Sequence, residues 1–328
     1  MLYIDNYTGA LQYHRKVLSC WLKIKIHGKL KINKICKFCG DSDCESKLTK
    51  SYEHTFSLET KSFFTEKIID DLLSSEPEDL LKINVRYKRD NSFIVDKPFI
   101  ENLFKVAGYT IFFQKNHGKE FLNNLNRSTC TYCNRNYTLN VSINHASAQM
   151  DHWFPKTLFP LLSLSFYNLI PSCSTCNHIK GQSKKKEIWW QKRSLIEMLH
   201  PYFPEPNESF KFDFFYKEST KEFTVLFRDM IGKKISKTLD FNLTQQNYQA
   251  HAYLELKDLY DLKKKYTENY ITFLLDKLKI VEPSDEVHYR LLFGVEKNPN
   301  NYHKRPFSKF KNDIIEKLLE IDNKELNL

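Results

Sequence analysis

Apolar side chains recur at intervals of three and four residues in several parts of the chain. This spacing is found around residues 63–73 and 99–109, and again through 246–281 and 307–320. It is typical of helices that bury one face. We therefore expect a mainly helical structure in residues 1–115 and further helices near the carboxyl end.

Strand patterns interrupt this helical background in two places. Residues 210–216 and 223–227 alternate aromatic and polar side chains across a short polar break, which predicts a β-hairpin. Residues 141–150 are expected to form two short strands with a turn near Asn144 and His145. Helices and strands that are segregated in this way indicate an α+β protein.

The 328 residues divide into three expected regions, and they are enough for a sizeable core. Residues 1–117 form a mainly helical N-terminal region, and residues 193–328 form a C-terminal region with the hairpin and helices. Residues 118–192 carry most of the candidate chemistry. Hydrophobic residues make up 41% of the chain, with only 8 glycines and 11 prolines, which excludes a disordered or fibrous protein.

The charge of the chain is compatible with a polyanionic partner. Lys and Arg outnumber Asp and Glu by 50 to 40, and residues 14–37 are basic whereas 70–79 are acidic. A nucleic-acid-binding face and an ordinary solvated face both remain open for the basic segment. No charged-then-apolar leader opens the sequence and no run of about 18 apolar residues occurs. We therefore expect a cytoplasmic protein without membrane segments.

Two Cys-x-x-Cys pairs, Cys130/Cys133 and Cys173/Cys176, predict a structural zinc site. Each pair lets two thiolates reach one ion from a tight turn, and two pairs complete a closed tetrahedral site. Disulfides are not expected in a reducing cytoplasm, and the alternative is two unrelated pairs of buried thiols. Zinc would join the two ends of segment 134–172, so folding of this unit should depend on the metal.

A second cysteine group lies in the N-terminal region. Cys36, Cys39 and Cys44, together with the more distant His54, offer three thiolates and one imidazole, a donor set that zinc accepts. A second zinc site and a group of buried thiols are both open. The remaining cysteine, Cys20, stands alone in the sequence, and we expect it to be buried.

Four polar residues lie between and beside the Cys-x-x-Cys pairs: Asp151, His152, Asn168 and Asn177. Carboxylate and amide oxygens suit Mg²⁺ or Mn²⁺, and a neutral imidazole can take a proton from water as a general base. Adjacent residues of a strand point to opposite faces, so a bulge or a strand end is needed to bring Asp151 and His152 to one phosphate. For an isolated Asp-His pair, a hydrogen-bonded structural role is the alternative.

The order of these residues resembles a known class of enzymes. The strings Cys130-Thr-Tyr-Cys, Met150-Asp-His-Trp-Phe-Pro-Lys156 and Tyr167-Asn-Leu-Ile-Pro-Ser-Cys-Ser-Thr-Cys-Asn-His-Ile-Lys180 are similar to the zinc-containing branch of the HNH, or ββα-metal, endonucleases. This specific match is confined to residues 130–180 of the 328. It implies a ββα-metal core stapled by the four-cysteine zinc site and flanked by largely helical regions.

The resemblance also implies a role for each polar residue. His152 would be the general base, Asp151 and Asn177 would hold one Mg²⁺ or Mn²⁺, and Asn168 would fix the loop through backbone hydrogen bonds. The chain departs from a literal His-Asn-His order at Asn177, where the family uses His or Asn. The implied reaction is hydrolysis of a phosphodiester bond to 5′-phosphate and 3′-hydroxyl ends.

Basic and aromatic residues follow the last cysteine. Lys180 and Lys184 are expected on the same helix, where they could hold substrate phosphates or simply form a solvated face. Trp189 and Trp190 are expected in the core rather than as stacking platforms for bases. His178, like His145, is expected to be a structural or surface residue.

A weaker resemblance extends to 199–203 and 305–311 and is to the HNH subunits of bacterial anti-phage systems, especially Septu-type systems. It implies a partner ATPase and a nucleic-acid substrate, with DNA favoured and RNA, such as tRNA, open. The competing class is a zinc-stabilised nucleic-acid-binding subunit that does not cleave. The presence of both Asp151 and His152 weighs against that class.

Overall fold

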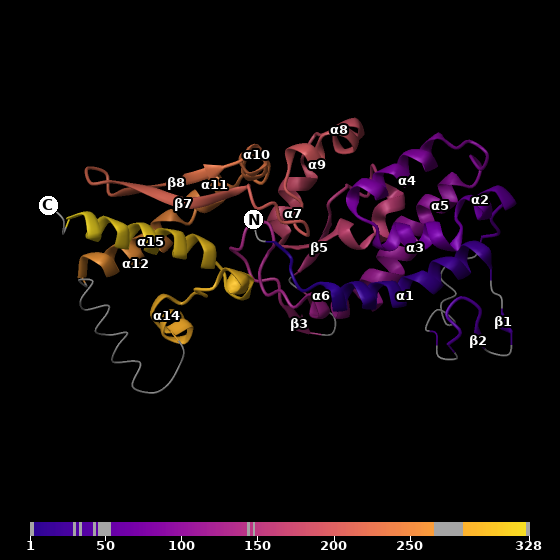
Figure 1. Ribbon diagram of the computed structural model, residues 1–328, viewed down its shortest axis with the longest axis horizontal. Helices are drawn as coiled ribbons and strands as arrows, with labels where there is room; N and C mark the ends of the chain where they lie inside the picture. Colours follow the sequence, from indigo (N-terminus) through magenta and orange to yellow (C-terminus); the bar gives the residue numbers. More distant parts are fainter. Residues whose placement is uncertain are drawn as a thin grey trace.

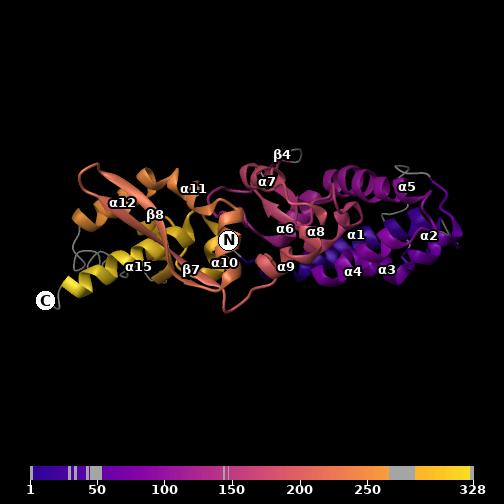
Figure 2. The same cartoon turned by 90° about the horizontal axis from the view of Figure 1, so that it is seen from above.

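The computed structural model combines many helices with four two-stranded antiparallel sheets among the residues that it describes, which are 3–28, 31–32, 35–41, 44, 54–142, 145–146, 148–265 and 285–325. Figure 1 shows an elongated molecule with the N-terminal helices at one end and the hairpin with the C-terminal helices at the other. The segment that carries the Cys-x-x-Cys pairs lies between these two ends, and the view from above in Figure 2 has the same order.

The N-terminal region is helical, as the apolar spacing predicts, with one small sheet. Its elements are α1 (Thr8–His27), β1 (Lys31–Ile32), β2 (Ile35–Cys36), α2 (Leu58–Phe63), α3 (Glu66–Ser74), α4 (Pro77–Arg89), α5 (Lys97–Asn102), a π-helix η2 (Leu103–Gln114) and α6 (Gly118–Leu125). Local residues set several of the helix starts. The hydroxyl of Ser57 accepts the backbone N–H of Thr60 before α2, and Thr65 does the same for Ile68 before α3.

The central segment contains two small sheets and the helix that follows them. Its elements are β3 (Asn140–Ser142), β4 (His145–Ala146), β5 (Gln149–His152), the 3-10 turns η3 (Pro160–Leu164) and η4 (Phe166–Asn168), β6 (Leu169–Ser172), α7 (Ser174–Gly181), α8 (Glu187–Lys192) and α9 (Ser194–Glu197). β5 pairs antiparallel with β6, and α7 starts directly after β6. The chain therefore forms a strand-strand-helix unit around the predicted site residues.

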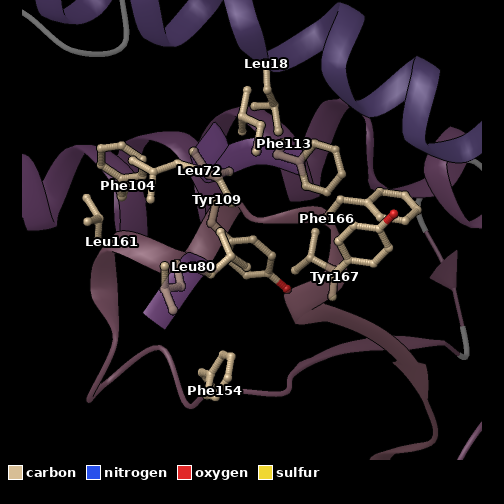
Figure 3. Close-up of a cluster of buried hydrophobic side chains, with 14 of the residues drawn as sticks. Leu18, Leu72, Leu80, Phe104, Tyr109, Phe113, Phe154, Leu161, Phe166 and Tyr167 are labelled. Carbon is tan, nitrogen blue, oxygen red and sulfur yellow. The ribbon is translucent and has the colours of Figure 1, made fainter. Parts of the chain in front are cut away.

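The central segment and the N-terminal helices share one hydrophobic core. This core takes buried side chains from residues 4–202 and includes the four cysteines of the Cys-x-x-Cys pairs. In Figure 3, Leu18 of α1, Phe113 of η2 and Phe166 of η4 point into the same cluster. Trp190 is fully buried in it, in keeping with its expected place in the core.

Two histidines are buried in or beside this core. From them we expect the free energy of unfolding to fall in mild acid. Burial lowers the pKa of His14 and of His200 to about 3. An unfolded histidine takes up a proton below about pH 6.5 whereas these two do not, so stability falls from pH 6.5 toward pH 3 by about 1.4 kcal/mol per pH unit for each. Urea unfolding at pH 7, 6 and 5 measures this slope.

The histidine substitution that best tests this slope is His14→Phe, because His14 is enclosed by the rings of Phe113, Phe121 and Phe166. We expect it to remove roughly a quarter of the pH dependence, because the pKa values of His152, His200 and His303 are lowered as well. His178→Ala serves as the control, since His178 is exposed on α7. Equal slopes in the wild type and in His14→Phe would contradict the assignment.

The C-terminal region is built around a hairpin in the place where the alternation predicts one. Its elements are β7 (Ser209–Lys217), β8 (Glu222–Ile231), α10 (Lys233–Phe241), α11 (Thr244–Gln249), α12 (Ala252–Lys265), α14 (Asp285–Phe293), η6 (Pro299–Lys304) and α15 (Ser308–Glu325). Alternate residues of β7 pack with α15 in a second core drawn from residues 199–318. The predicted helical pattern of 246–281 extends beyond residue 265, outside the described residues.

The helices of the described residues give no candidate for a membrane span, since none is both long and apolar enough.

Candidate active site and metal centres

The four cysteines of the Cys-x-x-Cys pairs meet at one point of the core. Their sulfur atoms all lie within 4.8 Å of one another, and Cys133 Sγ and Cys173 Sγ are 3.9 Å apart. Sulfurs of a tetrahedral site with Zn–S bonds of about 2.3 Å are separated by about 3.8 Å, whereas a disulfide requires about 2.05 Å. The arrangement therefore fits a structural metal such as zinc and does not fit a pair of disulfides.

The surroundings of these cysteines favour metal binding. The Asn136 amide donates to Cys173 Sγ at 3.3 Å, and the pKa of the Cys173 thiol is lowered by its hydrogen bonds to Cys130 and the other cysteines. Burial raises the pKa of Cys130, so this thiol ionises only when a cation compensates its charge. All four residues are buried, which protects such a site from solvent.

Residues far along the chain hold the first cysteine turn in shape. Asn134, which follows Cys133, has a left-handed backbone with φ of 49°, a conformation that Asn tolerates. Its side-chain amide donates to the carbonyl oxygens of Tyr302 at 2.9 Å and Arg305 at 3.1 Å. The hydroxyl of Tyr248 donates to the carbonyl oxygen of Cys133 at 2.5 Å. The C-terminal region is thus connected to the Cys130–Cys133 turn by direct hydrogen bonds.

The second cysteine group differs from the predicted one in its fourth member. The sulfurs of Cys20, Cys36, Cys39 and Cys44 all lie within 4.8 Å of one another, so this group is also compatible with a structural metal. Cys20 is therefore not alone, because α1 carries it against the segment that holds the other three. His54 lies elsewhere.

His54 has its own structural role. Its Nε2 is 3.3 Å from Asp96 Oδ1, and its ring stacks on Phe99 with a centroid separation of 3.9 Å. The sequence could not distinguish Cys20 from His54 as the fourth donor, because that choice depends on how α1 packs.

Metal analysis should show whether Cys20 or His54 is the fourth metal ligand of the second cysteine group. We expect two zinc ions per chain in the purified protein, one in Cys20→Ser and two in His54→Ala, because only Cys20 lies with the other three thiols. Native mass spectrometry of the intact protein measures the number of zinc ions bound per chain. A loss of zinc in His54→Ala, with no loss in Cys20→Ser, would reverse the assignment.

The predicted site residues outside the cysteine groups, except Asn168, border one cleft. It has a volume of about 750 Å³, and among its lining residues are Asp151, His152, Asn177, Lys180 and Lys184. Asp151 and His152 are the last two residues of β5, and their pairing with β6 is regular. The strand end, rather than a bulge, is what allows both neighbours to reach the cleft.

His152 is held in one orientation. Its Nε2 lies 3.1 Å from the carbonyl oxygen of Ser163, and its ring packs edge-on against Tyr109 at 4.4 Å. A carbonyl oxygen only accepts hydrogen bonds, so Nε2 carries the hydrogen and Nδ1 is left with a free lone pair. Burial and the nearby Lys156 lower the pKa of His152 to about 3, so the ring is neutral at neutral pH.

Asp151 is paired with a lysine rather than open to solvent. Its Oδ2 accepts a hydrogen bond from the Tyr132 hydroxyl at 2.6 Å and lies 2.7 Å from Lys180 Nζ. Lys180 also donates to the carbonyl oxygen of His152. Burial lowers the pKa of Lys180, whereas the Asp151 carboxylate acts in the opposite direction. Lys180 is therefore part of the cleft wall and is not a freely exposed phosphate ligand.

The two asparagines have different surroundings. Asn168 is buried, accepts the backbone N–H of Phe154 at 2.6 Å and donates to the carbonyl oxygens of Phe154 and Leu162, which ties together the loop between β5 and β6. Asn177 is on the cleft side of α7, and its Nδ2 donates to Gln149 Oε1 at 2.7 Å. That bond leaves the amide oxygen of Asn177 as the atom available to a cation.

Lys184 lies outside the helix on which we expected it. α7 ends at Gly181, and Lys184, Lys185 and Lys186 follow in an exposed loop at the rim of the cleft. Gly and Ser are weak helix formers at this point, and the repulsion among three adjacent lysines adds to the tendency to leave the helix. The loop still places Lys184 beside the cleft.

Sequence reasoning missed two residues of the cleft region. Lys156 is half-buried, borders the cleft and has its ammonium 4.8 Å from the centre of the Tyr109 ring. Tyr132, between the first two cysteines, holds Asp151. Both residues stand inside the strings that carry the resemblance, but single Lys and Tyr residues have no spacing that marks them.

Comparisons of the chain with protein-family models, with curated proteins and with solved structures found no match.

Proposed function

We propose that this protein is a metal-dependent endonuclease of the HNH type that hydrolyses phosphodiester bonds, with DNA as the favoured substrate. The observation that carries the proposal is the cleft in which Asp151, His152 and Asn177 meet, with lysines around it. The adjoining strand-strand-helix unit and the four-cysteine group support it, because they are the parts that the sequence resemblance implies.

The donor set of the cleft suits a hard divalent cation. The Asp151 carboxylate and the Asn177 amide oxygen are the ligands that Mg²⁺ or Mn²⁺ accepts, with further positions left for water and phosphate. When bound, such a cation would stabilise negative charge on the scissile phosphate and the leaving oxygen. Asp151 and Asn177 are the residues that would hold it.

The remaining steps belong to the side chains of this chain. Nδ1 of His152 takes the proton of the attacking water, since Nε2 is engaged with the Ser163 carbonyl and the ring is neutral. The ammonium group of Lys156 and the lysines at the rim, such as Lys184, attract and orient the phosphate backbone. Asn168 keeps the loop in the shape that presents Ser163 to His152.

We further propose that the protein works in the cytoplasm as the effector of a bacterial anti-phage system, beside an ATPase. The support is the weaker sequence resemblance in 199–203 and 305–311. Within the structure, these two segments lie at the start of the C-terminal region and at the beginning of α15. Co-purification with the product of a neighbouring ATPase gene tests this part separately.

Cleavage assays on matched substrates test the enzymatic proposal. Supercoiled plasmid, linear DNA and structured RNA are incubated with the zinc-loaded protein in Mg²⁺, in Mn²⁺ and without a divalent cation, with and without the partner. We expect nicking of DNA that requires the added cation. Cleavage of RNA alone would make the protein a ribonuclease of the same mechanism, whereas binding without cleavage under every condition would favour the non-catalytic class.

A further inference from the structure

The cleft contains far more positive than negative charge. Its lining includes five lysines, 156, 180, 184, 185 and 186, and Asp151 is the one acidic residue among its lining residues. The other two residues of the proposed chemistry add no negative charge, since Asn177 is uncharged and His152 is neutral. A divalent cation that enters the cleft of the free protein therefore finds a single carboxylate in a positive surrounding.

That single carboxylate is already compensated. Lys180 Nζ lies 2.7 Å from Asp151 Oδ2, and Lys180 is only 4% exposed, so water screens this pair poorly. The Tyr132 hydroxyl donates a hydrogen bond to the same oxygen. Oδ1 is left for a cation, but the ammonium on the other oxygen cancels the charge that would attract one.

Lys180 has little room to leave this position. Its ammonium also donates to the carbonyl oxygen of His152 and lies 5.4 Å from the centre of the Trp190 ring and 5.9 Å from that of Trp153. Both tryptophans are fully buried. The positive charge is thus a built-in part of the cleft wall and is not a side chain that happens to rest there.

We infer that the free protein binds a divalent cation only weakly and that a nucleic-acid phosphate supplies the missing negative charge, so that cation and nucleic acid bind cooperatively. This inference rests on the proposed function and specifies how its site becomes loaded. The phosphate is attracted by Lys156 and the rim lysines, and it brings the anionic oxygen that Mg²⁺ or Mn²⁺ requires. Lys180 is then a positioning residue that makes loading depend on the substrate.

Cooperative binding is reciprocal, which makes it measurable from both sides. We would titrate Mn²⁺ into the zinc-loaded His152→Ala protein, which is not expected to cleave, and follow the free Mn²⁺ signal by electron paramagnetic resonance. The titration is repeated with a 12-base-pair DNA duplex and with a 12-nucleotide RNA, each corrected for the oligonucleotide alone. Fluorescence anisotropy of the same labelled oligonucleotides, with and without Mn²⁺, gives the reciprocal affinity.

We expect at least one oligonucleotide to raise the Mn²⁺ affinity by about tenfold or more, and Mn²⁺ to raise the affinity for that oligonucleotide by the same factor. Adding Lys180→Met should raise the Mn²⁺ affinity of the free protein by about tenfold and remove most of the cooperativity. Lys180→Arg keeps the charge and should retain the weak binding. Lys192→Met, on the exposed side of α8 and outside the cleft, is the control and should change neither quantity.

The results separate this inference from the proposed function. Tight Mn²⁺ binding to the free protein, unchanged by oligonucleotides, would overturn the inference and leave the nuclease proposal standing. No Mn²⁺ binding under any condition would remove both. The comparison with and without oligonucleotide needs no change at Lys180, so it decides the matter even if Lys180→Met fails to fold.

Discussion

His152→Ala is expected to reduce the rate of nucleic-acid cleavage by a factor on the order of 10² to 10⁴, the usual contribution of a general base. The physical reason is that His152 combines a free Nδ1, a fixed orientation through Ser163 and a neutral ring in the cleft. The measurement is the single-turnover rate on the substrate that the wild type cleaves, with zinc content checked in both proteins.

A second histidine, His178 on α7, provides a matched control. His178 is exposed on α7 and pairs with Gln182, so His178→Ala should cleave at the wild-type rate and keep its zinc. Cleavage by His152→Ala at an unchanged rate would show that another group activates the water. Loss of zinc from His152→Ala would instead mean that the variant has lost the structure of the site.

Cys173→Ser is expected to lose the metal of the first cysteine group and to unfold the core around it. Structural zinc sites contribute about 10–16 kcal/mol to folding in small zinc domains, which is comparable to the whole stability of a typical protein, about 5–15 kcal/mol. Cys173 belongs to the same core as α1 and η2, so the loss should spread beyond the central segment. Circular dichroism melts and metal analysis measure both effects.

The second cysteine group provides the comparison for this substitution. Cys39 is exposed and its group lies at the N-terminal helices, so Cys39→Ser should release one zinc ion while the central segment stays folded. A Cys173→Ser protein that lacks the zinc of the first cysteine group and yet melts like the wild type would show that this metal does not stabilise the site.

The parts that could be predicted from the sequence are those governed by short spacings. A Cys-x-x-Cys turn has a geometry of its own, so two such turns could be assigned to one metal without knowledge of the fold. The alternation in residues 210–227 and the apolar spacing near 63–73 likewise reflect local periods of strands and helices. The same reasoning identified the need for a bulge or a strand end at Asp151 and His152.

The parts that could not be predicted depend on packing between distant segments. Cys20 joins its group only because α1 lies beside Cys36, Cys39 and Cys44, and no neighbouring residue in the sequence marks it as a metal ligand. The pairing of Lys180 with Asp151 follows from the way α7 lies against β5. Lys184 was misplaced because periodicity does not indicate where a short helix ends.

The bonds of Asn134 to Tyr302 and Arg305 have a practical consequence for anyone who wishes to isolate the catalytic portion. A fragment that stops near residue 192 would contain every cysteine and acid-base group named for the cleft, yet it would lack the backbone acceptors that hold the turn after Cys133. Shortened versions of this protein should therefore keep the carboxyl-terminal segment that contains Tyr302 and Arg305, and also the N-terminal helices that share the core of the central segment.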